Sequence, residues 1–232
     1  HHPLNLEVIG AEAQHDNMQS AAYRVIWGFL RKCPASKVRF CIFDPKEGGG
    51  SVRMLSNFVN KMPDYYKRAV TQMSRTEELL SCLKELEGQT LDFIRDRPDY
   101  DDLLDYNAHN PRRTEAITLL MLYDFPLNAD ARCLELLSSV MQKGNKCGIY
   151  VILCRNTAVE VASSYDHVDE KLAELEKNCV QIECKENGFA LLPYHLSVRL
   201  IEKPDAGQLE KFAVEYHKAV EKLNVQSIHF EE

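Results

Sequence analysis

Short apolar runs alternate with segments of helical periodicity along the first part of the chain. Leu4 to Ile9 is a short, largely apolar run and predicts a buried strand. From Met18 to Arg31 the apolar residues recur at helical spacing, so we expect a helix that packs one face on a sheet and ends before Pro34. Val38 to Phe43 is β-branched and aromatic and predicts a second strand. Two strands joined by such a helix form a βαβ unit, in which the strands are expected to be parallel.

A mainly helical region follows the second predicted strand. Gly48 to Gly50 lead into helical spacing from Val52 to Met62. Another helix is predicted to start at Ser74, because Ser74 and Glu77 have the spacing of a capping box. We therefore expect a helical insertion at residues 52–112, between strands of the sheet.

The pattern of strand and helix resumes after this insertion. Ile117 to Tyr123 is a continuous apolar run, which is typical of a strand buried on both faces of a parallel sheet. Asp130 to Lys143 predicts a helix, with Gly144 as the residue that ends it, and Ile149 to Cys154 predicts the next strand. The alternation of strands and helices predicts an α/β fold of three layers, with a mostly parallel sheet and flanking helices.

A hairpin and a closing helix are predicted in the last part of the chain. Val180 to Cys184 and Phe189 to Leu192 flank Asn187 and Gly188, a pair that favours a hairpin turn. We therefore expect a hairpin near residues 180–192. Asp205 to Leu223 has apolar residues on one helical face and predicts the closing helix.

Composition and charge limit the class of protein. Of the 232 residues, 45% are hydrophobic and 27% are charged, which is typical of a globular chain that buries a large core. We expect a single domain over residues 1–232, with His1 to Pro3 as a tag remnant. The net charge of −7 argues against DNA binding by this domain alone, because such binding depends on neutralisation of phosphates by Lys and Arg. No stretch approaches the roughly 20 apolar residues that span a bilayer, so no membrane insertion is predicted.

The cysteines indicate a reducing compartment. None forms a CxxC pair and none has a histidine at zinc-finger spacing, so no metal site is predicted. Several lie in apolar runs, where a thiol behaves as a small core residue. We expect reduced cysteines and a cytoplasmic location. The eight are Cys33, Cys41, Cys82, Cys133, Cys147, Cys154, Cys179 and Cys184.

The turn after the first predicted strand has the length of a phosphate-binding P-loop, whose pattern is G-x-x-x-x-G-K-[ST]. Gly10 matches the first glycine, but His15 stands at the second glycine, Asp16 at the lysine, and Asn17 at the Ser/Thr that holds magnesium. An adverse charge near a surface costs about 4 kcal/mol, whereas a helix dipole contributes only about 0.3 to 1 kcal/mol. We predict that this turn does not hold a nucleotide's phosphates. The alternative is a polar connection that was never a P-loop.

Asp124 follows the apolar strand of Ile117 to Tyr123, which is the position of the magnesium-organising carboxylate in P-loop ATPases. The next residue in those enzymes is a glutamate that activates water, and here it is Phe125. Without that base, hydrolysis by the usual route is not expected, and no catalytic residue is assigned. Alternatively, Asp124 caps a helix.

Three segments resemble the RecA-type motor domains of the FtsK/SpoIIIE family, and most of all the divergent domain upstream of the active motor in some large members. They are KVRFCIFDPKEGGG (residues 37–50), LMLYDFP (residues 120–126) and LLSSVMQKGNKCGIYVIL (residues 136–153). The third contains the G-x-x-x-G-[IV]-[YH] start of a strand, and DLLDYNA (residues 102–108) is also similar to that domain. The resemblance covers residues 4–155.

The resemblance implies a RecA-like, P-loop NTPase fold within a larger multidomain ATPase of the DNA-translocase or secretion type, of which this chain is a fragment. The chain departs from the family at Gly144 to Lys146, where the motors have G-R-A, and at Arg155 to Thr157, where they carry a polar sensor. Asn156 keeps part of the sensor's character. Because the P-loop lysine and the hydrolytic glutamate are absent, the family's ATPase activity is not carried over, and no cofactor is expected.

The sequence is compatible with three functions. The first is a non-catalytic module that regulates or assembles an active ATPase domain of the same protein or of ring neighbours. The second is an ATPase that binds ATP and magnesium at a non-standard site made by Asp44, Lys46, Asp124 and Asn156. The third is a domain that recognises a protein or peptide substrate through an unfilled cleft.

Overall fold

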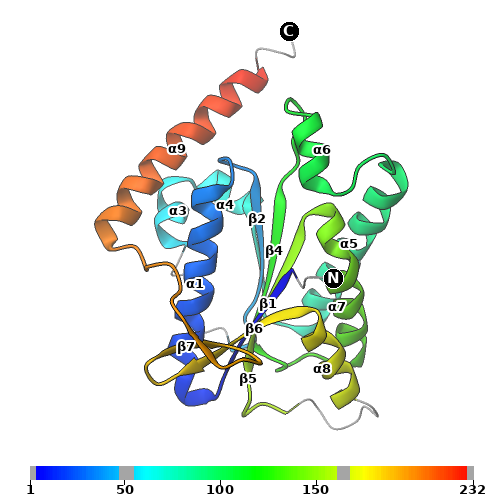
Figure 1. The fold of residues 1–232 in the computed structure, drawn as a ribbon. Coiled ribbons are helices and arrows are strands. Elements are labelled where there is room, and N and C mark those ends of the chain that lie inside the picture. The colour runs from blue at the N-terminus through cyan, green and yellow to red at the C-terminus, as the bar shows by residue number, and fades with distance from the viewer. Residues whose placement is uncertain (1–3, 47–54, 161–167, 229–232) are drawn as a thin grey trace.

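One eight-stranded sheet forms the centre of the computed structural model, which describes residues 4–46, 55–160 and 168–228 (Figure 1). The strand order is β3-β2-β4-β5-β1-β6-β7-β8, and every pairing from β3 to β6 is parallel. The pairings of β6 with β7 and of β7 with β8 are antiparallel. The strands are β1 (Asn5–Gly10), β2 (Val38–Phe43), β3 (Val70–Met73), β4 (Ile117–Phe125), β5 (Ile149–Asn156), β6 (Cys179–Lys185), β7 (Gly188–Leu191) and β8 (Leu196–Val198).

Helices cover both faces of the sheet, so the predicted three-layer α/β fold with a mostly parallel sheet is confirmed. Figure 1 shows α1, α3 and α9 on one face and α5, α7 and α8 on the other. The helices are α1 (His15–Lys32), α3 (Ser56–Lys61), α4 (Pro63–Ala69), α5 (Thr76–Asp96), α6 (Leu103–His109), α7 (Ala131–Lys143), α8 (Val168–Lys177) and α9 (Ala206–Ile228), with short 3-10 turns at Glu12–Gln14 and Gly144–Cys147.

The central strands are buried on both faces because their side chains alternate between two apolar cores. On β4, Leu120 and Leu122 pack beneath α5 and α7, while Leu119 and Met121 pack beneath α1 and α9. All four have 0% exposure. This double burial explains why the run appears as continuously apolar in the sequence.

The parallel relationship of β1 and β2 is as expected, but the two strands are not neighbours. β4 and β5 lie between them in the sheet. The helix α1 therefore crosses two strands on its way from β1 to β2.

The predicted helical insertion at residues 52–112 is wrong in one respect, because it contains the parallel edge strand β3. Its four residues pair with β2, and Thr71 and Gln72 are exposed. So short and polar a strand has no clear periodicity in sequence, and its pairing with β2 determines it. Gly48 to Gly50 lie outside the described residues.

Two predicted helix boundaries also need correction. The helix α5 begins at Thr76, and Glu78 rather than Glu77 closes its first turn by accepting hydrogen bonds from the backbone N–H of Ser74 and Arg75. After α7, Gly144 keeps right-handed helical angles with φ of −61°. The left-handed residue that ends this segment is Gly148, with φ of 75°.

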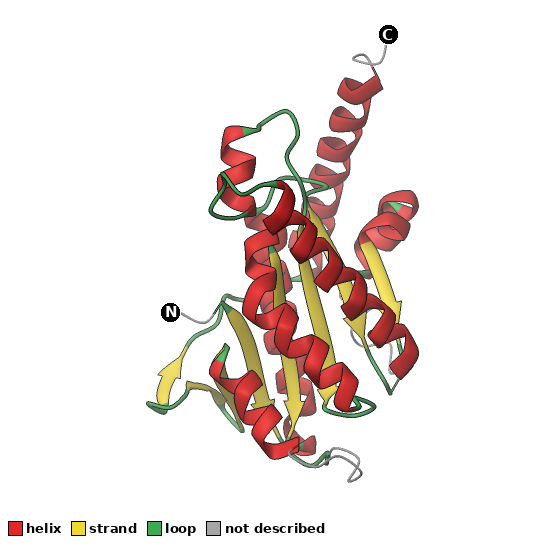
Figure 2. Ribbon diagram, turned by 90° about the vertical axis from the view of Figure 1, so that its right-hand side faces the viewer, coloured by secondary structure: helices red, strands yellow, loops and turns green. Residues whose placement is uncertain are grey.

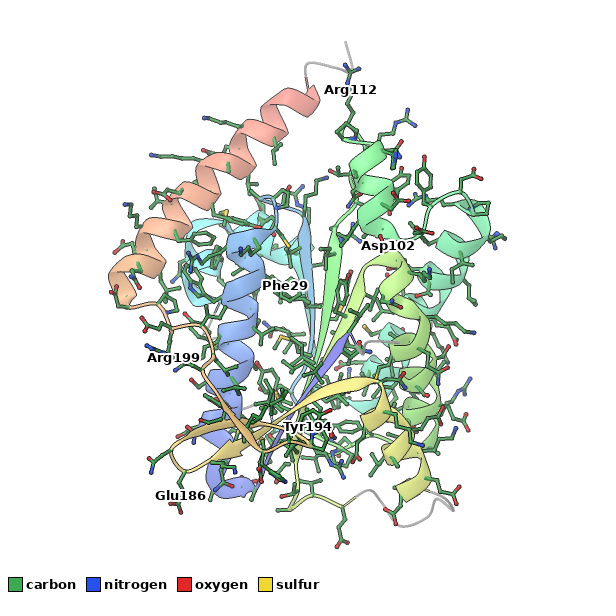
Figure 3. All side chains as sticks on the ribbon, in the orientation of Figure 1. Phe29, Asp102, Arg112, Glu186, Tyr194 and Arg199 are labelled. Atoms are coloured by element: carbon green, nitrogen blue, oxygen red, sulfur yellow. The ribbon has the colours of Figure 1, made fainter. Side chains whose placement is uncertain are left out.

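The hairpin near residues 180–192 is confirmed, with β6 and β7 antiparallel and Glu186 in the turn between them (Figure 3). The strand β8 and the helix α8 were not predicted, since only Leu175 of α8 is buried and β8 has three residues. Within the described residues, no helix combines the length and the apolar character that a bilayer crossing requires.

Candidate functional site

The carboxyl end of β4 carries a bulge that turns Asp124 out of the regular strand. Leu122 pairs with Leu153, but Phe125 pairs with Arg155, so the register shifts between them. Asp124 has φ of 48°, in the left-handed region that short polar residues such as Asp adopt more readily than others. A bulge re-aims side chains, and here it directs the carboxylate toward the β1–α1 turn and the end of β2.

Lys46 joins two carboxylates at this edge of the sheet. Its Nζ donates to Asp124 Oδ1 at 3.0 Å and to the two Glu12 carboxylate oxygens at 3.1 and 3.2 Å. Asp124 is the buried member, with 2% of its side chain exposed, whereas Lys46 and Glu12 are 38% and 62% exposed. The ammonium therefore closes the solvent side of a buried carboxylate.

His15 and Asn156 complete the group around Asp124. His15 Nε2 lies 3.4 Å from Asp124 Oδ2. Asn156, which is fully buried, donates from Nδ2 to Asp124 Oδ1 at 3.2 Å and to Glu12, and its Oδ1 accepts from the Ala158 N–H. We call the five residues Glu12, His15, Lys46, Asp124 and Asn156 the carboxyl-edge cluster.

Ion pairing outweighs burial at the two central groups of this cluster. Burial acts to raise the pKa of Asp124, but hydrogen bonds from Lys46 and Asn156 lower it below its ordinary value. Burial likewise acts to lower the pKa of Lys46, but its bonds to Asp124 and Glu12 raise it. The hydrogen bonds from Asn156 and Lys46 lower the pKa of Glu12. All three groups are therefore charged at neutral pH.

The β1–α1 turn is compact because a 3-10 turn fills it. Residues Glu12–Gln14 form this turn, and Gln14 Oε1 accepts a hydrogen bond from the Ala11 N–H at 3.0 Å. A Cβ on Gly10 would lie 3.0 Å from Gln14 Cβ, so the glycine permits the start of α1 to fold closely over the strand end. The turn then runs directly into α1 at His15.

The candidate residues named from sequence meet only in part. Gly10, His15, Asp44, Asp124 and Asn156 all lie at the carboxyl edge of the parallel strands, and His15, Asp124 and Asn156 are in contact.

The other two candidates point elsewhere. Asp16 is exposed on the first turn of α1. Asn17 donates from Nδ2 to the backbone oxygen of Lys185 at 3.1 Å, toward β6 and away from Asp124.

The alternative role of Asp124 as a helix cap is wrong. The residue that caps α7 is Asp130, whose carboxylate accepts a hydrogen bond from the Cys133 N–H at 2.8 Å. Phe125, at the position of the hydrolytic glutamate, is 2% exposed and belongs to the core beneath α5 and α7.

The sequence reasoning missed the link between Lys46 and Glu12. Lys46 was predicted as part of a non-standard nucleotide site, but Glu12 was not predicted to lie beside it, and the signal that joins the two residues is topological. Lys46 follows β2 and Glu12 follows β1, and the carboxyl ends of parallel strands share one edge of a sheet. A second charged group, the buried Glu7 with Arg155, lies on the opposite side of these strands beneath α8.

No protein-family model matches the chain, and no curated protein matches it in sequence. Solved structures do match. ATPases 2 and 3 of EssC from Geobacillus thermodenitrificans have a TM-score of 0.59 at 11% identity, over 94% of this chain and 44% of that one. The cytoplasmic domain of the type VII secretion ATPase EccC from Thermomonospora curvata has a TM-score of 0.54 at 17% identity, over 78% and 20%. The pCW3 conjugation coupling protein TcpA has a TM-score of 0.52 at 12% identity, over 94% and 53%.

These likenesses establish the fold. The chain shares its fold with ATPase domains of EccC and EssC, so the RecA-like fold that the sequence resemblance implied is confirmed. The chain spans between 20% and 53% of the length of these three proteins. Their other domains have no counterpart in the residues described.

Proposed function

We propose that this chain is a RecA-like module of an FtsK/SpoIIIE-type ATPase that does not hydrolyse nucleotide itself. It acts by contact with an active ATPase domain, whose assembly or substrate access it sets. One observation carries the proposal: the chain's own cation, Lys46, is bound between Glu12 and Asp124 at the edge where such folds bind a nucleotide's phosphates.

The side chains at this edge do not fit a triphosphate with magnesium. A phosphate-binding turn needs open backbone N–H groups and a free cation, but the Ala11 N–H is bonded to Gln14 and Lys46 is bonded to two carboxylates. Glu12 and Asp16 add negative charge at the same turn. At an effective dielectric of 20, one such charge at contact distance repels a phosphate by about 4 kcal/mol, several times the helix dipole's attraction.

The lengths of the structural neighbours support a role beside other domains. The EssC structure contains two ATPases, and this chain covers 44% of it. We infer that a domain which keeps the fold but lacks phosphate chemistry acts through contact with such neighbouring domains. The partner is therefore an ATPase domain of the same protein or of a ring neighbour, in a translocase or secretion motor.

Calorimetric titration with ATP and Mg²⁺, together with a phosphate-release assay, tests the proposal. We expect no binding in the micromolar range and no release of phosphate. Micromolar binding with turnover overturns the proposal. Glu12→Gln, measured beside the wild-type chain, separates a blocked site from an absent one: weak binding that appears only in this variant, in which Lys46 loses one of its two carboxylate partners, identifies the ion pairs as the block.

A second candidate is a nucleotide site of non-standard design, favoured by the convergence of Lys46, Asp124 and Asn156. In that case ATP and magnesium bind to the wild-type chain, and Asp124→Ala abolishes the binding. Unchanged binding in the variant excludes this candidate.

Peptide recognition is the third candidate function. EccC of Thermomonospora curvata forms a complex with a signal sequence peptide. The charged, hydrogen-bonded character of the carboxyl-edge cluster argues against an apolar peptide at this edge.

A further inference from the structure

A cavity of about 440 Å³ lies between α5 and the edge strands β2 and β3, on the sheet face that Figure 2 shows. Its walls include Arg39 and Cys41 from β2, Arg68 from the end of α4, and Cys82 and Glu85 from α5. None of these residues belongs to the carboxyl-edge cluster, so the cavity is independent of the function proposed above.

Two thiols meet in this cavity. Cys82, buried on α5, donates a hydrogen bond to the half-buried Cys41 on β2. This bond is the largest effect that lowers the pKa of Cys41; burial and Glu85 oppose it, and Arg39 assists it. The same bond and burial raise the pKa of Cys82.

Cys41 differs from the other seven cysteines of the chain. Each of the others has a raised pKa, mainly through burial, except for Cys82, where the bond to Cys41 contributes most. The thiolate is the nucleophilic form of cysteine. Cys41 therefore combines a lowered pKa with a place on the wall of a cavity large enough to admit a small reactant.

The charges around the cavity favour an anionic reactant. Arg39 lies two residues from Cys41 on the same face of β2, and no hydrogen bond or ion pair engages it within the described part of the chain. Of the two glutamates of the wall, Glu78 is ion-paired with Arg75, whereas Glu85 accepts from the neutral amide of Gln89, which leaves one carboxylate beside two arginines, Arg39 and Arg68. The guanidinium of Arg39 is thus available to a carboxylate.

We propose that Cys41 is a site of thiol–disulfide exchange with a small anionic disulfide of the oxidised-glutathione class. The Cys41 Sγ thiolate attacks one sulfur of the disulfide, a new S–S bond forms, and the original S–S bond breaks. The other half leaves as a thiolate and takes up the proton that Cys41 lost. Exchange conserves electrons, because one disulfide is replaced by another.

The mixed disulfide is the end state rather than an intermediate. Release of the bound thiol requires attack by the Cys82 thiolate, and burial keeps Cys82 protonated. The modification fills the space between α5 and β2–β3, and a small reducing thiol reverses it.

Peptide mapping by mass spectrometry tests the site on the wild-type chain after incubation with oxidised glutathione. We expect one added glutathionyl group, on the peptide that contains Cys41, and its removal by dithiothreitol. Modification of another cysteine at an equal or higher rate overturns the proposal. A Cys41–Cys82 disulfide as the main product overturns the assigned end state.

Charge selectivity provides a second measurement. Cystamine carries the same reactive bond with positive charge, so we expect oxidised glutathione to modify Cys41 several-fold faster than cystamine does, and Arg39→Gln to remove that preference. Equal rates in the wild-type chain overturn the role of Arg39. Cys82→Ala should slow the reaction at Cys41 about tenfold by withdrawing its hydrogen-bond donor. Cys33→Ser, at a half-buried thiol outside the cavity, is the matched control and should leave the rate unchanged.

Discussion

Lys46 Nζ lies 3.0 Å from Asp124 Oδ1, and this contact ties the loop after β2 to the bulge of β4. The two residues differ greatly in exposure, at 38% for the Lys46 side chain and 2% for that of Asp124. Removing the lysine therefore leaves a charge in a buried position, whereas removing a lysine from a surface pair leaves a charge in water.

We expect Lys46→Ala to lower the free energy of unfolding by about 1 to 3 kcal/mol, the cost of a buried charge that loses one partner. Lys61→Ala is the matched control, because the Lys61 side chain has a similar exposure of 42% but its partner Glu210 is 70% exposed. The control should change the free energy by less than about 0.5 kcal/mol. Urea denaturation measures both, and equal losses contradict the assignment.

The same pair predicts a defined dependence of stability on pH. The pKa of Asp124 lies below its ordinary value of 3.8, so its contribution is complete above that pH and is lost as the pH falls through the lower folded value. The pKa of Lys46 lies above 10.5, so its contribution is complete below that pH and is lost as the pH rises through the higher folded value.

Comparison of the wild-type chain with Lys46→Met isolates this effect. The difference in free energy of unfolding between the two should be constant between about pH 5 and 10 and should shrink toward both extremes. A difference that stays constant down to pH 2 contradicts the pairing. Denaturant titrations at a series of pH values provide the measurement.

Substitution by alanine should change the stability of the fold in opposite directions at Gly148 and at Gly88. Gly148 has φ of 75°, and an added Cβ would lie 2.3 Å from Leu103 Cδ2, so Gly148→Ala should destabilise the fold by about 1 to 3 kcal/mol. Gly88 lies inside α5 with nothing within 4 Å of the added Cβ. Gly88→Ala should stabilise the fold by about 0.5 to 1 kcal/mol. Thermal melts of the two variants test this: the melting temperature should fall for Gly148→Ala and rise for Gly88→Ala.

Arg155→Ala should lower the free energy of unfolding by about 3 kcal/mol. The reason is that Glu7, beneath α8 and only 1% exposed, loses the cation that pairs with it. Within the described chain, Gln181 then remains as the one other partner of Glu7. Arg199→Ala removes an arginine whose pair with Glu202 is fully at the surface, with 85% and 79% exposure, and should change stability by less than about 0.5 kcal/mol (Figure 3). Chemical denaturation of the two variants is the test, and a loss below 1 kcal/mol for Arg155→Ala contradicts it.

The sequence predicts most of the sheet because its central strands are buried on two faces. The bounds of β2 were predicted in full, and those of β4 and β5 to within two residues at each end. The strands at the edges of the sheet were harder to predict from the sequence. Strand β3 has only four residues, with the exposed Thr71 and Gln72 adjacent to each other, and β8 has three residues, so pairing rather than periodicity determines both strands.

The candidate site was predicted as separate positions rather than as a cluster. The sequence identified Asp124 from its place after an apolar strand, Asn156 from the resemblance to the sensor of the motor domains, and Lys46 as a candidate ligand. It did not reveal the bulge that turns Asp124 to φ of 48°, since bulges leave no mark in hydrophobic periodicity. Nor did it reveal that Asn17 turns toward Lys185, because the start of α1 sets that direction.

The position of β1 in the sheet has a consequence for how the chain folds. β1 is the first strand in sequence, yet it pairs with β5 and β6, as Leu6 with Ile152 and with Val180. During synthesis it emerges long before either neighbour exists, so its edge toward β5 stays open until residue 156 has been made and its edge toward β6 until residue 185 has been made. Such distant pairings slow folding and leave unpaired edges exposed to other chains. The middle of this sheet therefore cannot close before the first 185 residues have been made.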